Sequence, residues 1–247
     1  MNEAITVKTN QLTRRFGKFV AVDQVSIEVY QKEIFGFLGA NGAGKTTMIR
    51  MLCGLLKPSD GNGTVAGLDI KTQSEIIKQN IGYMSQKFSL YEDLTISENI
   101  EFYGGVYGLS REKIEQKKDE LFKQLRLNEY AKKYTRDLPL GIRQRLALGS
   151  ALLHDPPIIF LDEPTSGVDP KARRGFWDLI YQTAESGKTV FVTTHYMDEA
   201  EYCHRISIMQ QGKLIALDSP AHLREKYQKK SMQDVFISLV KTEVGGN

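Results

Sequence analysis

An octapeptide at residues 39–46, GANGAGKT, restricts the possible folds of this chain more than any other segment. It fits the pattern G-x-x-x-x-G-K-[ST], which forms a phosphate-binding loop between a β-strand and an α-helix. Both neighbours are predicted here, because residues 34–38 are an apolar run typical of a buried strand and apolar positions from Met48 to Leu56 follow at helical spacing. We therefore expect an α/β core that binds a phosphate group at this loop.

The loop has a defined chemistry. Its backbone amides and the positive end of the following helix attract phosphate oxygens. Lys45 is expected to reach the β- and γ-phosphates of a nucleotide, and the Thr46 hydroxyl to ligate Mg²⁺. The alternative is a plain glycine turn. The residues expected to bind nucleotide are Gly39, Asn41, Gly42, Ala43, Gly44, Lys45, Thr46 and Thr47.

A second motif, IIFLDE at residues 158–163, predicts a buried strand that ends in two acidic residues. In a parallel sheet its carboxyl end lies beside the phosphate loop. Asp162 is then expected to hold Mg²⁺ through water, and Glu163 to polarise a water that attacks the γ-phosphate. A similar string, SGKT at residues 186–189, lacks the upstream glycine, and we expect its glycine to end a helix.

The order of predicted strands and helices indicates the domain organisation. Apolar strands alternate with amphipathic helices, which predicts an α/β fold with a mostly parallel sheet. Residues 5–30 read instead as an N-terminal antiparallel β patch, and residues 92–148 as an inserted helical subdomain. We expect the core at residues 1–91 and 149–219, and a C-terminal helical tail at 220–247 that begins with Ser219 as N-cap and Pro220 at the first helical position.

Within the helical block, two local signals are clear. Thr95 and Glu98 form a capping box at the start of one helix. The charged stretch at residues 110–133, with apolar positions including Leu125 and Leu127, is expected to be helical throughout.

Composition excludes several classes of protein. The 247 residues carry 33 Lys and Arg against 30 Asp and Glu, so the net charge of +3 gives no reason to expect a nucleic-acid partner. The two cysteines are too few for a disulfide scaffold. No apolar run approaches the ~18–20 residues that span a bilayer, and no signal peptide is visible at the N-terminus, so we expect a cytoplasmic protein.

Five motifs together resemble an ATP-binding cassette (ABC) ATPase over nearly the whole chain. They are the phosphate loop, IGYMSQ at 81–86, LPLGIRQRL at 138–146, LDEPTSGVD at 161–169, and His195 after the strand TVFVTT. The variants GANGAGKTT and LDEPTSGVDP are similar to the exporter branch, whose cassettes pair with permeases for drugs, lipids or polysaccharides. The resemblance implies ATP and Mg²⁺ as cofactors, an integral-membrane permease as partner, and attachment to the inner face of the cell membrane through it.

The resemblance also assigns roles to individual residues. Phe16 matches the aromatic residue that stacks on adenine, although it could be an ordinary core or surface aromatic. Gln86 matches the glutamine that contacts Mg²⁺ and the attacking water, with a plain loop residue as the alternative. His195 matches the histidine that hydrogen-bonds the γ-phosphate and helps hold Glu163, with a structural histidine as the alternative. The expected catalytic residues are Glu163, His195, Gln86 and Lys45, while Phe16 is expected only to bind the nucleotide.

Two positions are implied to act across a dimer of cassettes, which could be a homodimer or a heterodimer. Asp169 matches an aspartate at the dimer interface, and it is also a good N-cap before Pro170. Gly141 matches the glycine that contacts the partner's ATP. The run at 138–142 reads LPLGI where the family usually has Leu-Ser-Gly-Gly and a variable residue. Because Pro139 has neither a hydroxyl nor an N–H, this contact is either a tolerated variant or the weak half of an asymmetric pair.

Three functions remain to be compared. The motif set favours the nucleotide-hydrolysing subunit of an exporter. A soluble ABC-type ATPase acting on ribosomes or DNA is less favoured, since such chains usually carry two cassettes or a long coiled coil. A P-loop kinase or GTPase is disfavoured, because no Asn-Lys-x-Asp motif occurs. The transported substrate is not encoded in any motif of the chain.

Overall fold

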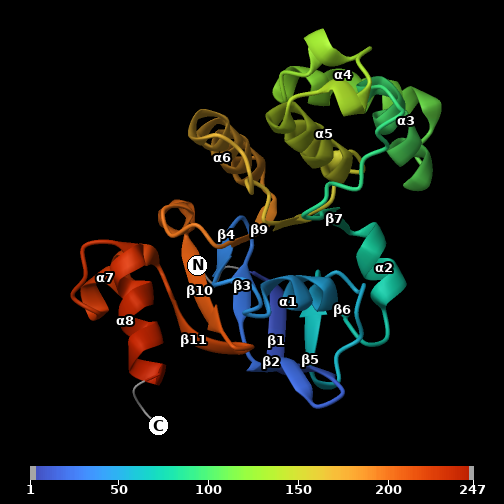
Figure 1. Cartoon of the computed structure of the whole chain (residues 1–247). Helices are drawn as coiled ribbons and strands as arrows, with labels where there is room; N and C mark the ends of the chain where they lie inside the picture. Colours follow the sequence, from blue (N-terminus) through green and yellow to red (C-terminus); the bar gives the residue numbers. More distant parts are fainter. Residues whose placement is uncertain (1–3, 245–247) are drawn as a thin grey trace.

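The computed structural model describes residues 4–244, with the backbone alone for 241–244. Within that range the strands form two sheets, one mostly parallel with six strands and one antiparallel with five. Figure 1 shows helices α3, α4 and α5 gathered on one side of the molecule, with β1, β2 and β5 on the opposite side. The predicted fold class, an α/β core with an antiparallel β patch and an inserted helical part, is confirmed.

The mostly parallel sheet positions the phosphate loop. Its strands lie in the order β11-β10-β4-β9-β8-β7, and all neighbours are parallel except β10 and β11. Every residue of β4, β8 and β9 is buried, as expected for strands covered on both faces. The carboxyl ends of these three strands therefore meet at one edge. The bounds are β4 Ile34–Leu38, β7 Ile81–Met84, β8 Ile158–Asp162, β9 Thr189–Thr194, β10 Arg205–Gln210 and β11 Lys213–Asp218.

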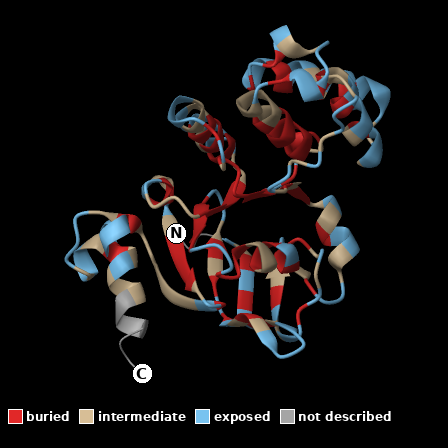
Figure 2. Ribbon diagram, viewed as in Figure 1, coloured by how far each residue is buried: buried red, intermediate tan, exposed pale blue. Residues whose placement is uncertain are grey.

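Side chains alternate between the two faces of this sheet. Phe35, Phe160 and Phe191 pack on one face, with α1 (Lys45–Leu52) and residues of the antiparallel sheet. The opposite face carries Ile159 and Val192, which pack with α5 (Leu140–Leu152) and α6 (Pro170–Glu185). Figure 2 shows the buried residues in red along the central strands and the inner sides of these helices.

The antiparallel sheet is built around β1 (Ile5–Phe16), which pairs with β2 (Phe19–Val25), β3 (Glu28–Tyr30) and β5 (Asp60–Val65); β6 (Leu68–Asp69) pairs with β5. The antiparallel patch is confirmed, and it also includes β5, whose sequence DGNGTV is not typical of a strand. Gly61 explains the sequence: it has φ +72°, and a Cβ there would lie 2.1 Å from the Gln11 carbonyl oxygen. The strand needs glycine because two backbones approach closely.

The inserted helical part contains α3 (Ile96–Val106), α4 (Arg111–Gln124) and α5, and α3 packs against both others. The capping box of Thr95 and Glu98 is confirmed. The continuous helix over 110–133 is wrong, because α4 ends at Gln124 and Arg126 adopts φ 55°. Leu125 and Leu127 are both buried, and residues two apart do not share a helix face, so the chain must turn between them.

The remaining helices are α2 (Ser74–Gln79), α7 (Pro220–Lys226) and α8 (Met232–Val244), with a 3-10 turn at Glu199–Tyr202 (η3). Ser219 and Asp169 are N-caps followed by proline, as predicted, and Gly187 follows α6 with φ +100°. No helix in the described part of the chain has the length and hydropathy of a membrane span.

Candidate functional site

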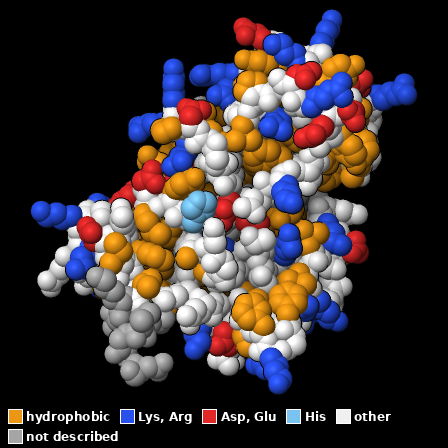
Figure 3. Space-filling model, viewed as in Figure 1, with side chains coloured by type: hydrophobic (Ala, Val, Ile, Leu, Met, Phe, Trp, Pro, Cys, Tyr) orange, Lys and Arg blue, Asp and Glu red, His pale blue; other side chains and the backbone are white. Residues whose placement is uncertain are grey.

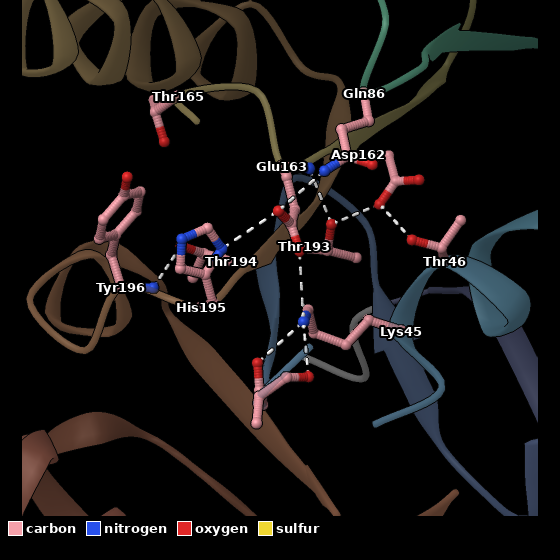
Figure 4. Close-up of polar contacts among 12 residues, drawn as sticks. Lys45, Thr46, Gln86, Asp162, Glu163, Thr165, Thr193, Thr194, His195 and Tyr196 are labelled. Carbon is pink, nitrogen blue, oxygen red and sulfur yellow. Dashed lines mark hydrogen bonds and ion pairs between the residues drawn. The ribbon is translucent and has the colours of Figure 1, made fainter. Parts of the chain in front are cut away.

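The phosphate loop connects β4 to α1 at the edge where β8 and β9 also end. Gly44 has φ +105°, and a Cβ there would lie 2.5 Å from the Ala21 carbonyl oxygen, so this position requires glycine. Lys45 is 3% exposed, and its ammonium donates to the carbonyl oxygens of Gly39 at 2.8 Å and Ala40 at 3.1 Å. The lysine therefore lies folded across its own loop (Figure 4).

Asp162 ends β8 next to the start of α1. The Thr46 hydroxyl donates to Asp162 Oδ1 at 3.1 Å, and the Thr193 hydroxyl of β9 donates to the same oxygen at 2.7 Å. Burial raises the pKa of the Asp162 carboxyl above its usual value, the charge of Glu163 adds to this rise, and the two hydroxyls oppose it. A bound cation would favour the charged form.

Glu163 is the point where the candidate catalytic residues meet. Its Oε1 lies 3.3 Å from Lys45 Nζ, while Oε2 lies 3.2 Å from Gln86 Nε2 and 3.1 Å from His195 Nδ1. The residue is 8% exposed and has φ 49°, a left-handed conformation that is uncommon outside glycine. The side chains of Lys45, Gln86 and His195, from three different segments, thus converge on the Glu163 carboxylate (Figure 4).

Thr193 is a site residue that the motif analysis missed. It is fully buried, and its Oγ1 accepts the backbone N–H of Glu163 at 2.8 Å while donating to Asp162. The Thr193 hydroxyl therefore holds both the backbone of Glu163 and the carboxylate of Asp162. The available signal was the polar pair Thr193-Thr194 at the end of an otherwise apolar strand.

A cleft of about 330 Å³ opens in front of the loop, within the size range of small-molecule sites. Sequence reasoning missed Phe19, which lines this cleft and is 62% exposed. Phe16 is 47% exposed and pairs with Phe19 across the hairpin, and the Arg14 guanidinium lies 4.5 Å from its ring centroid. The residues lining the cleft are Phe19, Ala21, Asn41, Gly42, Gly44, Lys45, Thr46, Thr47, Gln86 and Glu163.

The donors at the cleft fit Mg²⁺. Thr46 and Asp162 offer a hydroxyl and a carboxylate whose oxygens are already 3.1 Å apart. In the described residues no group of three or more His, Cys, Asp and Glu side chains could hold a metal by itself. Mg²⁺ is usually bound by one or two protein oxygens together with phosphate oxygens and water.

Gly141 and Asp169 do not line this cleft in the described structure, but they lie close to each other. A Cβ at Gly141 would be 3.4 Å from Cβ of Ala172. The Asp169 carboxylate accepts the N–H groups of Lys171 at 3.1 Å and Ala172 at 3.0 Å, so it caps α6. Pro139 is the N-cap of α5, which means that the helix begins normally despite the proline.

A phosphate loop, an acid at the end of a neighbouring strand and a parallel sheet define a P-loop nucleotide-binding domain. The family to which it belongs follows from comparison. The family model described as "ABC transporter" matches residues 22–166, more than half of the chain. The chain therefore belongs to the ABC transporter family, as the motifs suggested, and this family binds ATP.

Curated relatives agree. The chain is 47% identical over 239 residues to the probable multidrug ABC transporter ATP-binding protein YbhF of Escherichia coli, covering 95% of this chain and 41% of that protein. It thus spans less than half the length of this relative. It is 37% identical over 218 residues to the linearmycin resistance ATP-binding protein LnrL of Bacillus subtilis, covering 88% of this chain and 70% of the relative.

Solved structures give the same fold. A structure described as an ATP binding subunit of an ABC transporter has a TM-score of 0.84 at 25% identity, covering 95% of this chain and 99% of the other. The dimeric ATP-binding cassette MJ0796 bound to ADP and Pi has a TM-score of 0.78 at 27% identity, covering 86% of this chain and 98% of the other.

Proposed function

We propose that this chain is the ATP-hydrolysing part of an exporter, in which two cassettes close on ATP and reopen after hydrolysis to drive a separate membrane permease. The observation that carries the proposal is the convergence of Lys45, Gln86 and His195 on the Glu163 carboxylate beside the phosphate loop. A base, two orienting groups and a phosphate-binding cation are the parts that phosphoryl transfer to water requires.

In the proposed reaction, a water oxygen attacks the γ-phosphorus while Glu163 accepts a proton from that water. The bond from the γ-phosphorus to the bridging oxygen breaks, and ADP leaves. Gln86 and His195 contact the same oxygen, Oε2, so they fix the direction in which the carboxylate faces. Lys45 exchanges its contact with Glu163 for the β- and γ-phosphate oxygens when nucleotide enters the cleft. Thr46, Asp162 and Gln86 would hold Mg²⁺, which would neutralise part of the phosphate charge.

Nucleotide binding itself can be tested at the loop. We expect Lys45→Ala to abolish binding of MgATP, because the phosphates lose their buried cation. Isothermal titration with MgATP measures this, and Lys57→Ala in the loop after α1 is the matched control that should bind like the wild type. Equal binding by both variants would contradict the assignment of the cleft.

The adenine is proposed to stack on the aromatic pair of the β1–β2 hairpin, with Phe16 as the residue that the family pattern assigns and Phe19 as its neighbour at the cleft. Stacking on a ring contributes roughly 0.5–1.5 kcal/mol beyond the area buried. Comparing Phe16→Ala with Phe19→Ala by ATP titration identifies the stacking residue.

The second cassette is proposed to complete each site through Gly141 and Asp169, whose helices start side by side. In the proposed C₂ dimer, these helix starts would face the partner's phosphate loop. The double variant Pro139→Ser with Leu140→Gly should strengthen ATP-dependent dimerisation if the LPLGI run is a weak contact. Unchanged dimerisation, measured by light scattering, would show that the variant run is tolerated.

The permease is proposed to dock in a groove of about 270 Å³ between the core and the inserted helical part that contains α3 and α5. The groove is lined by Leu55, Phe88, Tyr103 and Tyr107 among others, and it adjoins the segment that carries Gln86. Hydrophobic side chains, orange in Figure 3, are exposed on the helical part among Lys and Arg. An apolar segment of a permease on the inner face of the membrane fits such a lining.

This docking is tested with Leu55→Glu, because Leu55 is 50% exposed and lines the groove. We expect the variant to remain folded and to lose co-purification with a membrane protein of several apolar spans. Ile237→Glu, which is 42% exposed on α8, is the matched control. Co-purification with ribosomes and with no membrane protein would overturn the transport proposal.

A further inference from the structure

A buried carboxylate outside the cleft ties together the segments that carry the catalytic candidates. Glu199, in the 3-10 turn η3, has no exposed surface. Its Oε1 accepts the hydroxyl of Thr165 at 2.5 Å, and its Oε2 accepts the hydroxyl of Thr194 at 2.6 Å. A buried carboxyl group without solvent requires hydrogen-bond partners, and the two threonine hydroxyls supply them.

The two threonines belong to different loops of the site. Thr165 lies two residues after Glu163, and Thr194 lies immediately before His195. One carboxylate oxygen of Glu199 therefore holds the segment that follows Glu163, and the other holds the segment that carries His195. The Oε2 of Glu163 and the Nδ1 of His195 lie 3.1 Å apart. Figure 4 shows Thr165, Thr194 and His195 on the same side of Glu163.

Arg173 adds a third segment to this arrangement. Its Nε lies 3.7 Å from Glu199 Oε1, and its guanidinium lies 3.8 Å from the ring centroid of Tyr196, the residue after His195. The backbone N–H of Tyr196 also donates to Thr194 Oγ1 at 3.0 Å. Arg173 sits in the first turns of α6, which Asp169 caps.

We propose that Glu199 is a positioning residue, which sets the distance and angle between Glu163 and His195 by clamping the loops after β8 and β9. The inference rests on the proposed hydrolytic function and adds a residue that does not touch nucleotide. Since misplacement of reacting groups by about 1 Å can lower a rate about 100-fold, loosening this clamp should affect turnover more than binding.

The test uses the full chain and compares three variants of the clamp with one control variant. Glu199→Gln removes the charge, Thr165→Val removes one donor, and Thr165→Ser keeps that donor. Glu33→Gln is the matched control, because Glu33 is also buried and paired with an arginine, Arg205 at 2.6 Å, but belongs to the far end of β4. The readouts are kcat, ATP Kd, Tm, and the imidazole NMR resonances of His195, which His195→Ala assigns among the four histidines.

We expect Glu199→Gln and Thr165→Val to shift the His195 resonances and to lower kcat at least about tenfold, with the ATP Kd within about threefold of wild type. Thr165→Ser should restore both readouts, and Glu33→Gln should lower Tm alone. Unmoved His195 resonances and an unchanged kcat in folded Glu199→Gln protein would overturn the clamp. If Glu163→Gln hydrolyses ATP like the wild type while His195 still moves in Glu199→Gln, the proposed base is wrong and the clamp stands.

Discussion

Replacing Thr193 by valine tests how the two acids are held. The change keeps the shape of a fully buried side chain but removes its hydroxyl. The hydrogen bond to the Asp162 carboxylate is lost, and a bond to a charged group contributes about 1.5–3 kcal/mol. The buried N–H of Glu163 is left without its acceptor at a cost of about 1–3 kcal/mol. We therefore expect the free energy of unfolding to fall by about 2.5–6 kcal/mol.

Urea unfolding measures this loss, followed by the fluorescence of the single tryptophan, Trp177, which is buried on α6. Thr183→Val is the matched control: Thr183 is equally buried, but its hydroxyl donates to the Leu179 carbonyl of its own helix at 2.7 Å, so the loss should stay below about 1 kcal/mol. Equal losses in the two variants would refute the proposed role of Thr193.

Two further changes probe the loop and the metal site. Gly44→Ala should abolish MgATP binding and lower the free energy of unfolding by at least about 2 kcal/mol, because its Cβ would meet the Ala21 carbonyl. The control is Gly67→Ala, at φ +76° in open space, which should lower the free energy of unfolding by about 1 kcal/mol. Thermal unfolding of the two variants measures the difference. Asp162→Asn should raise Tm at pH 7 without Mg²⁺ and abolish Mg²⁺-dependent ATP binding. Because burial raises the pKa of Asp162 in the fold, its contribution to stability is present below pH 3.8 and is lost as the pH rises through the raised value, so the variant should gain most at neutral pH. A lower Tm for the variant at pH 7 would contradict this sign.

Much of the fold was predictable because local signals and burial agree. The apolar runs that became β4, β8 and β9 are buried at every residue, and the caps at Thr95, Asp169 and Ser219 each precede a helix. In these elements, backbone preference and tertiary packing favour the same structure.

One strand was not predicted and one helix was predicted too long, and in both places tertiary contacts override local preference. In β5, Gly61 is needed for close approach to Gln11, yet glycine and aspartate indicate a turn in the sequence. At the end of α4, Arg126 adopts a left-handed conformation without a glycine to mark it. Composition predicts neither feature, because both depend on a neighbouring segment.

The site shows the same division. Lys45, Thr46, Asp162, Glu163, Gln86 and His195 were singled out by motifs, and the structure brings them together. Thr193 and Glu199 were missed, because each acts on other protein groups rather than on the ligand. The roles of Thr193 and Glu199 depend on which strands and loops are neighbours in the fold. A single sequence does not show which segments are neighbours.

Glu163 is proposed to be the base for hydrolysis of ATP bound at residues 39–46. The most direct measurement compares phosphate release and ATP binding by wild type and Glu163→Gln in the presence of Mg²⁺. We expect the variant to bind ATP at least as tightly, to accumulate as an ATP-bound dimer, and to lose at least about 100-fold in kcat, within the range of general base catalysis. Hydrolysis by Glu163→Gln at the wild-type rate would contradict the account.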